Sequence, residues 1–185
     1  SSVGVNAQNW PQAKPPVAEK KEHIRDIHGD KVNDPYYWMI DYFKKGEYYV
    51  ANADYELAVV QISKAISLDA SDPNFFLKRG FCFNILKKHQ EAIADFSAAI
   101  KLIPDNKFAY LSRGSAKNKT GQFESAIDDF NKVLELDPSD QEAYNNRGFS
   151  KKELGDSSGA CDDWKKSKKL GNKEAPIILK NNYCK

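Results

Sequence analysis

Apolar residues recur at steps of three and four through most of the chain, which is the spacing of one face of an α-helix. The alternation typical of a β-strand is absent from these stretches. The clearest stretch contains Tyr110, Leu111, Ala116, Ala126, Ile127, Phe130, Val133 and Leu134. We therefore expect helices near residues 36–51, 54–68, 74–86, 88–102, 107–119, 122–136, 141–153 and 156–170.

Residues typical of helix ends fall between these stretches. Asp72 offers an N-cap, and Pro73 follows it at a position where the missing N–H costs nothing. Ser139 and Glu142 have the spacing of a capping box. Gly121 falls where one helix must turn into the next. The end signals and the apolar spacing thus predict the same boundaries.

The whole pattern returns at an interval of 34 residues. Several residue types each form a series at this interval, and the series keep a constant offset from one another. Such agreement identifies an internal repeat. The series are Gly46, Gly80, Gly114 and Gly148; Ala58, Ala92, Ala126 and Ala160; Ile62, Phe96, Phe130 and Trp164; Tyr42, Phe76, Tyr110 and Tyr144; Ala65, Ala99, Val133 and Ser167; and Ala70, Pro104, Pro138 and Asn172.

The glycine and alanine of each unit explain how its two helices meet. They stand 12 residues apart on successive helices, where their lack of bulk lets the helix axes approach closely. One short helix pair cannot bury its apolar face alone, so each pair must lie against the next. The stretch from Pro176 to Leu179, followed by polar residues, predicts a ninth helix that caps the last pair.

This order of aromatic, glycine, alanine, aromatic, alanine and proline positions resembles the tetratricopeptide repeat, over about residues 39–174. The resemblance implies an all-α, right-handed superhelical solenoid of four helix-turn-helix units with a C-terminal capping helix and an extended N-terminal arm. We expect the arm over residues 1–35, the repeat domain over 36–174 and the capping helix and tail over 175–185. The four repeats would span residues 39–72, 73–106, 107–140 and 141–174. The stretch from Ala160 to Lys166 resembles bacterial members of the family.

The first 35 residues differ in character, because prolines at positions 11, 15, 16 and 35 disfavour a helix. Residues 14–38 resemble the opening segment of the prolyl oligopeptidase and oligopeptidase B family of serine peptidases. The Gly-x-Ser-x-Gly elbow of such enzymes is missing, since Ser150 lies within an expected helix and is followed by two lysines. We interpret the arm as a fused or shared leader and expect no enzymatic activity.

In tetratricopeptide-repeat proteins, the first helix of each unit lines a concave groove that binds a partner. An aromatic side chain beside an asparagine can take up an apolar side chain while the amide bonds an extended backbone. The resemblance therefore implies these partner-binding residues: Asn74, Leu77, Phe81 and Asn84; Phe108, Leu111, Ser115 and Asn118; and Asn145, Phe149 and Lys152. By the same rule Ile40, Phe43, Glu47, Val50 and Glu142 also face the groove.

Three arginines, Arg79, Arg113 and Arg147, each precede a repeat glycine. A series of cations could bind an anion. We expect instead that each arginine packs its stem between helices and bonds a neighbouring repeat with its guanidinium.

Composition argues against several other classes of function. The chain has 28 lysines and arginines and 26 aspartates and glutamates, so no overall field draws it to nucleic acid. No run of about 18 apolar residues predicts a membrane span. His23, Asp26, His28 and Asp30 could suggest a metal site, but no helix or strand is predicted there to fix the ligands. We expect no metal and no cofactor.

The cysteines give little information about compartment. Cys82, Cys161 and Cys184 have no metal-ligand spacing, and an odd number cannot all pair within one chain. Cys82 and Cys161 fall in expected helices, where we predict buried thiols. The Val5-Asn6-Ala7 tripeptide is similar to the end of an export signal, which favours a periplasmic or secreted location over the cytoplasm.

The leading prediction of function is a non-catalytic scaffold or adaptor that binds a protein or peptide in the groove. The alternative is an accessory or regulatory subunit of a peptidase or exported enzyme complex. In that case the N-terminal arm would be a docking or autoinhibitory element. The pattern predicts no particular oligomeric state.

Overall fold

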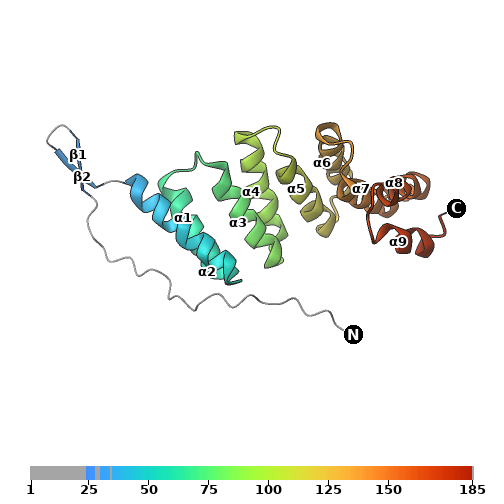
Figure 1. Cartoon of the computed structure of the whole chain (residues 1–185), viewed down its shortest axis with the longest axis horizontal. Helices are drawn as coiled ribbons and strands as arrows, with labels where there is room; N and C mark the ends of the chain where they lie inside the picture. Colours follow the sequence, from blue (N-terminus) through green and yellow to red (C-terminus); the bar gives the residue numbers. More distant parts are fainter. Residues whose placement is uncertain (1–23, 28–29, 34, 185) are drawn as a thin grey trace.

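The structure is a computed structural model that describes residues 24–27, 30–33 and 35–184, with side chains from Trp38 onward. Within residues 35–184 every regular element is a helix (Figure 1). Each of the eight predicted helices is found within one residue of its expected bounds, and the ninth caps the stack. The bounds are α1 Pro35–Ala51, α2 Tyr55–Leu68, α3 Pro73–Ile85, α4 His89–Leu102, α5 Lys107–Lys119, α6 Phe123–Leu136, α7 Gln141–Glu153, α8 Ser157–Lys169 and α9 Ala175–Asn181.

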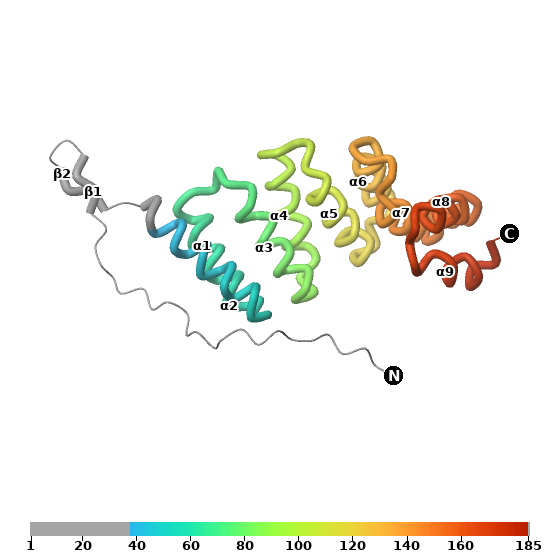
Figure 2. Tube along the Cα trace, in the orientation of Figure 1, coloured from blue at the N-terminus to red at the C-terminus, as the bar shows by residue number. Residues whose placement is uncertain are grey.

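The helices pack as consecutive pairs, and each pair lies against the next along the chain (Figure 2). The first helices of neighbouring repeats, α1, α3, α5 and α7, also contact one another directly. The predicted all-α solenoid is therefore confirmed for the helical part of the chain. None of the helices in this part is long and apolar enough to cross a bilayer.

Two short strands lie in the predicted N-terminal arm. β1 (Ile24–Ile27) pairs antiparallel with β2 (Asp30–Asn33), with Ile24 opposite Asn33. The sequence pattern does not predict them, because four-residue strands are too short to establish an alternation. Residues 1–23 lie outside the described residues, and with them the export-like tripeptide and His23 of the possible metal set; His28 lies outside as well.

The repeat glycines make room for the large aromatic of the same repeat. A Cβ placed on Gly114 would lie 2.8 Å from the Phe130 ring, which is closer than real Cβ contacts. Gly148 stands in the same relation to Trp164, at 2.7 Å. Phe130 is fully buried, so its ring fills the helix crossing. The glycine and aromatic series therefore describe one contact that recurs along the stack.

The helix ends follow the predicted chemistry with one exception. The Asp72 carboxylate accepts the Asn74 backbone N–H at 2.8 Å and caps α3. At α7 the cap is Asp140, which accepts the backbone N–H of Ala143 at 2.9 Å. The predicted capping box at Ser139 is wrong, because the Ser139 hydroxyl donates to Asp137 at 2.7 Å instead. Asp140 lies one residue nearer the helix, where its carboxylate reaches the backbone N–H groups of the first turn.

An arginine joins each of the last three repeats to the repeat before it. Arg113 on α5 donates through Nε and Nη2 to both carboxylate oxygens of Asp129 on α6, at 3.0 and 2.6 Å. Its Nη1 donates to Ser97 Oγ on α4 of the preceding repeat, at 3.0 Å. The predicted bond from the guanidinium to a neighbouring repeat is thus confirmed. The sequence did not predict the bidentate bond to the aspartate of the same repeat. The same arrangement links Arg79 with Asp95 and Ser63, and Arg147 with Asp163 and Asn131.

These aspartates are buried and depend on their cations. Asp129 is 3% exposed, and Lys117 adds a second ion pair to it at 2.8 Å. Burial raises the pKa of the Asp95 carboxyl, while the Arg79 hydrogen bonds oppose that rise. The hydrogen bond to Asp163 raises the pKa of Arg147. A carboxylate placed here without its partner would be costly.

A disulfide holds the C-terminal helix to the last repeat. Cys161 on α8 is bonded to Cys184 just after α9, with Cα atoms 5.5 Å apart. The predicted buried thiol at Cys161 is wrong, because α9 folds back and brings Cys184 beside it. Cys82 is a free buried cysteine as predicted, and burial raises the pKa of its thiol to about 11.

We predict that Asp129→Asn lowers the free energy of unfolding by roughly 3 kcal/mol, because it leaves Arg113 and Lys117 without a countercharge in a buried position. Denaturant unfolding followed by circular dichroism measures the change. Asp128→Asn is the matched control, since Asp128 is the adjacent, exposed carboxylate. Equal stability of the two variants would show that the arginine bridge does not hold the stack.

Candidate functional site

Two hollows lie along the helices that begin each repeat. The first, called here the apolar hollow, has a volume of about 320 Å³. Its lining comes from α1, α3 and α5: Val50, Asn74, Leu77, Lys78, Phe81 and Phe108. The second, called here the polar hollow, has a volume of about 430 Å³. Its lining comes from α5, α7, α8, α9 and the residue after α9: Ser115, Asn118, Lys119, Glu142, Asn145, Asn146, Phe149, Lys152, Trp164, Ile178 and Asn182.

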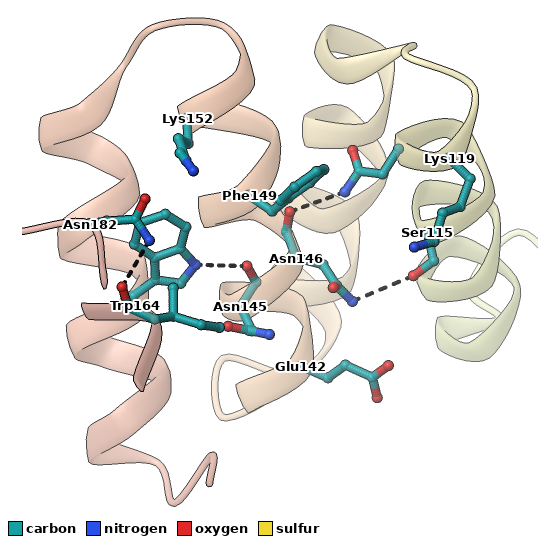
Figure 3. A pocket seen from close by; sticks show the side chains of 11 residues that line it. Ser115, Lys119, Glu142, Asn145, Asn146, Phe149, Lys152, Trp164 and Asn182 are labelled. Carbon is teal, nitrogen blue, oxygen red and sulfur yellow. Dashed lines mark hydrogen bonds between the residues drawn. The ribbon is translucent and has the colours of Figure 1, made fainter. Parts of the chain in front are cut away.

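Two asparagines of the polar hollow hold α5 against α7. Asn118 Nδ2 donates to the Asn146 backbone oxygen at 3.2 Å, and its Oδ1 accepts the Ser150 hydroxyl at 2.7 Å. Asn146 Nδ2 in turn donates to Ser115 Oγ at 3.4 Å (Figure 3). Both functional atoms of Asn118 are therefore already engaged in packing between repeats.

Asn145 differs from these neighbours. The indole N–H of Trp164 donates to the Asn145 backbone oxygen at 3.1 Å, which ties this turn of α7 to α8 (Figure 3). The side-chain Oδ1 of Asn145 is buried and has no hydrogen-bond partner among the described residues. A buried acceptor without a donor is uncommon in a folded protein and is costly to maintain. Asn145 therefore has an acceptor that the fold leaves unused.

Each hollow contains an exposed phenylalanine supported by an aromatic residue of the preceding helix. Phe149 in the polar hollow is 43% exposed and packs edge-on against Phe123, with ring centroids 6.2 Å apart. Phe81 in the apolar hollow is 38% exposed and packs in the same way against Tyr55, also at 6.2 Å. Because one side of each ring is held, the other side is a rigid apolar surface.

The charges of the polar hollow are divided. Lys119 and Lys152 are exposed and form no ion pair with any residue that the structure describes. Glu142 lies in the first turn of α7, whereas Lys152 lies near the end of the same helix (Figure 3). Burial raises the pKa of the Glu142 carboxyl, and the nearby charges of Asp140 and Glu174 raise it further. The end of the hollow near the two lysines is therefore cationic.

The apolar hollow contains less available polar chemistry. Lys78 forms an ion pair with Glu47 at 3.1 Å. Asn74 donates through Nδ2 to Asp72 Oδ1 at 2.9 Å, within the cap of its own helix. Val50, Leu77 and the two phenylalanines leave an apolar surface between them.

Nine of the eleven residues predicted from the groove rule line one hollow or the other. Asn84 and Leu111 line neither; Asn84 Oδ1 lies 3.3 Å from His89 Nδ1 at the start of α4. The rule missed six lining residues: Lys78, Lys119, Asn146, Trp164, Ile178 and Asn182. Trp164 belongs to the second helix of its repeat, Ile178 to α9, and Asn182 follows α9 directly. A rule restricted to the first helices of the repeats does not include them. Lys119 follows Asn118 directly at the end of its helix, and that adjacency is the one local signal for it.

No group of three histidine, cysteine or acidic side chains in the described part of the chain is placed to hold a metal ion. The arrangement instead combines apolar surfaces, amides and ammonium groups. These groups bind by shape, hydrogen bonding and charge.

Comparison with known families agrees with this architecture. One model, described as Tetratricopeptide repeat, matches residues 43–107, and another, described as TPR repeat, matches residues 114–155. The chain is built from tetratricopeptide repeats. Its glycine, alanine and aromatic series are the repeat positions, and its arginine bridges join one tetratricopeptide repeat to the next. A comparison with curated proteins gives no match.

Solved structures with the same fold include MamA, with a TM-score of 0.70 and 23% identity over 77% of this chain and 83% of that one. YrrB, described as a TPR protein with an unusual peptide-binding site, has a TM-score of 0.74 and 20% identity over 77% of this chain and 74% of its own. The TPR domain of Arabidopsis OM64 has a TM-score of 0.60 and 24% identity over 64% and 98%. At these sequence identities, the similarity to the three structures shows a shared fold and nothing more.

We predict that replacing both bonded cysteines, in Cys161→Ser/Cys184→Ser, loosens α9. The loss of a bond that closes a loop of this length lowers the free energy of docking by about 3 kcal/mol. Hydrogen exchange should show lower protection in α9 and unchanged protection in α3 to α5. Reducing agent should reproduce the effect in the original chain and have no effect on the variant. Unchanged exchange in α9 would mean that apolar packing alone holds the cap.

Proposed function

We propose that this protein is a non-catalytic adaptor that binds an extended segment of another protein in the groove along α1, α3, α5 and α7. The observation that carries the proposal is the buried, unpartnered Oδ1 of Asn145 beside the exposed ring of Phe149. An extended peptide has backbone N–H groups to satisfy the amide and side chains to cover the ring. Proteins made of these repeats are in general interaction scaffolds, and YrrB is described as having a peptide-binding site.

Apolar exposure along the same helices supports this choice. Phe81, Phe108 and Phe149 are each more than a third exposed, at 38%, 49% and 43%. They belong to α3, α5 and α7, so one face of the stack carries all three. Exposed aromatics gathered on one concave face are typical of a binding surface rather than of a simple solvated one.

The disulfide also bears on where the adaptor would work. Bonds of this type form and persist in oxidising compartments and are rare in the cytosol of mesophiles. The Cys161–Cys184 bond therefore supports the periplasmic or secreted location favoured by the export-like tripeptide. Thiol-alkylating reagent added to freshly broken cells before denaturation should leave both cysteines unmodified if this location is right.

The proposed function is tested with an array of ten-residue peptides of unbiased composition, followed by fluorescence anisotropy on the peptides that bind. Asn145→Ala and Phe149→Ala should each weaken binding by about tenfold, because each removes one contact of hot-spot type. Both side chains lie on the groove, so the fold should persist, and circular dichroism checks that it does.

The control is Gln90→Ala, an exposed amide on α4 that lines neither hollow. It should bind peptides as the original chain does. An array with no binding peptide, or equal losses in all three variants, would contradict the proposed function.

A further inference from the structure

We propose that the two hollows are subsites for one extended segment whose apolar end lies in the apolar hollow and whose acidic end lies between Lys119 and Lys152. This inference rests on the proposed function and specifies the chemistry of the partner. It commits to a segment of mixed character, with aliphatic or aromatic residues at one end and aspartate or glutamate at the other.

The apolar hollow favours the apolar end of the segment because it has no polar side chain available to bond a ligand. Its polar side chains are already committed, Lys78 to Glu47 and Asn74 to Asp72. The remaining lining is Val50, Leu77 and the exposed faces of Phe81 and Phe108. A segment that placed a charge here would lose hydration and gain no partner, so an apolar side chain is favoured.

Charge selects the other end. Several lysines of the stack are paired, as Lys117 is with Asp129 at 2.8 Å and Lys107 is with Asp137 at 2.7 Å. Lys119 and Lys152 have no such partner in the part of the chain that the structure describes, although both line the same hollow. Acidic side chains near these lysines would form charge-assisted hydrogen bonds with the ammonium groups, and those bonds would strengthen as water is excluded. Asn145 lines the same hollow, and its Oδ1 has no donor among the described residues.

The length of the segment follows from α5, which lines both hollows. Phe108 lies at the start of α5 and Lys119 at its end. They are separated by about 16 Å along the axis at the usual rise of a helix. An extended chain covers that distance with roughly five residues, so a segment of roughly ten residues reaches into both hollows.

Synthetic decapeptides test the inference. The probe carries leucine and phenylalanine at one end and three glutamates at the other, is labelled with fluorescein, and is made in both chain directions. One matched peptide has lysine in place of glutamate, and another has serine in place of the apolar residues. Anisotropy titration should give affinities about tenfold weaker for both matched peptides than for the probe.

Two sets of variants assign the ends. Lys119→Glu/Lys152→Glu should reverse the preference, so that the lysine peptide binds better than the glutamate peptide. Phe81→Ala should weaken both of these peptides by about tenfold and leave their ratio unchanged. The charge control is Lys168→Glu/Lys169→Glu, which changes the net charge equally on exposed positions of α8. The apolar control is Leu102→Ala, an exposed leucine outside both hollows.

Several results would overturn the inference. One is equal binding of glutamate and lysine peptides, and another is an equal loss in the Lys168/Lys169 control, which would show charge attraction without a site. A third is no binding of the probe in either direction. Array binders that lack this apolar-to-acidic pattern would overturn the inference alone, whereas an array without binders would overturn the proposed function as well.

Discussion

The arginine bridge between repeats is the contact on which the rest of the structure depends. Each bridging arginine is bonded to an aspartate of its own repeat and to a hydroxyl or amide of the repeat before it. The planar guanidinium has donors in fixed directions, so it restricts how one helix pair can rotate on another. The first repeat has Lys45 at the equivalent position, paired with Asp41 on its own helix at 2.8 Å. No earlier repeat precedes it in the described part of the chain, and the bridge accordingly begins at Arg79.

That fixed rotation decides which polar groups remain available in the groove. Asn118 and Asn145 are similar in type, and both face the groove. The packing of α5 on α7 places Ser150 and the Asn146 carbonyl against Asn118, so its amide is used within the fold. Asn145 lies at the other side of α7, where its backbone rather than its side chain bonds Trp164. Its unpartnered acceptor is therefore a product of the stacking geometry.

The C-terminal helix has two roles that follow from the same packing. A solenoid exposes the apolar side of its last pair unless something covers it. α9 covers it with Leu179, which clusters with Ala160 and Trp164, and the disulfide keeps it there. Ile178 of α9 and Asn182 directly after it then become a wall of the polar hollow. Capping the stack and shaping the proposed site are thus parts of one arrangement, so stability and binding are expected to be coupled at this end.

The sequence by itself determined the helices, their boundaries and their grouping into repeats. These depend on local chemistry: a helical period, caps such as Asp72, and a glycine paired with an aromatic residue in each unit. The resemblance to the repeat family, applied in the register of the 34-residue interval, also predicted nine residues that line the two hollows. The tertiary structure alone decided that Cys161 meets Cys184, that α9 lines a hollow, and that Asn118 is engaged while Asn145 is not. Those facts depend on where distant segments come together and what each contact shields from water, and no spacing along the chain specifies a crossing angle between helices.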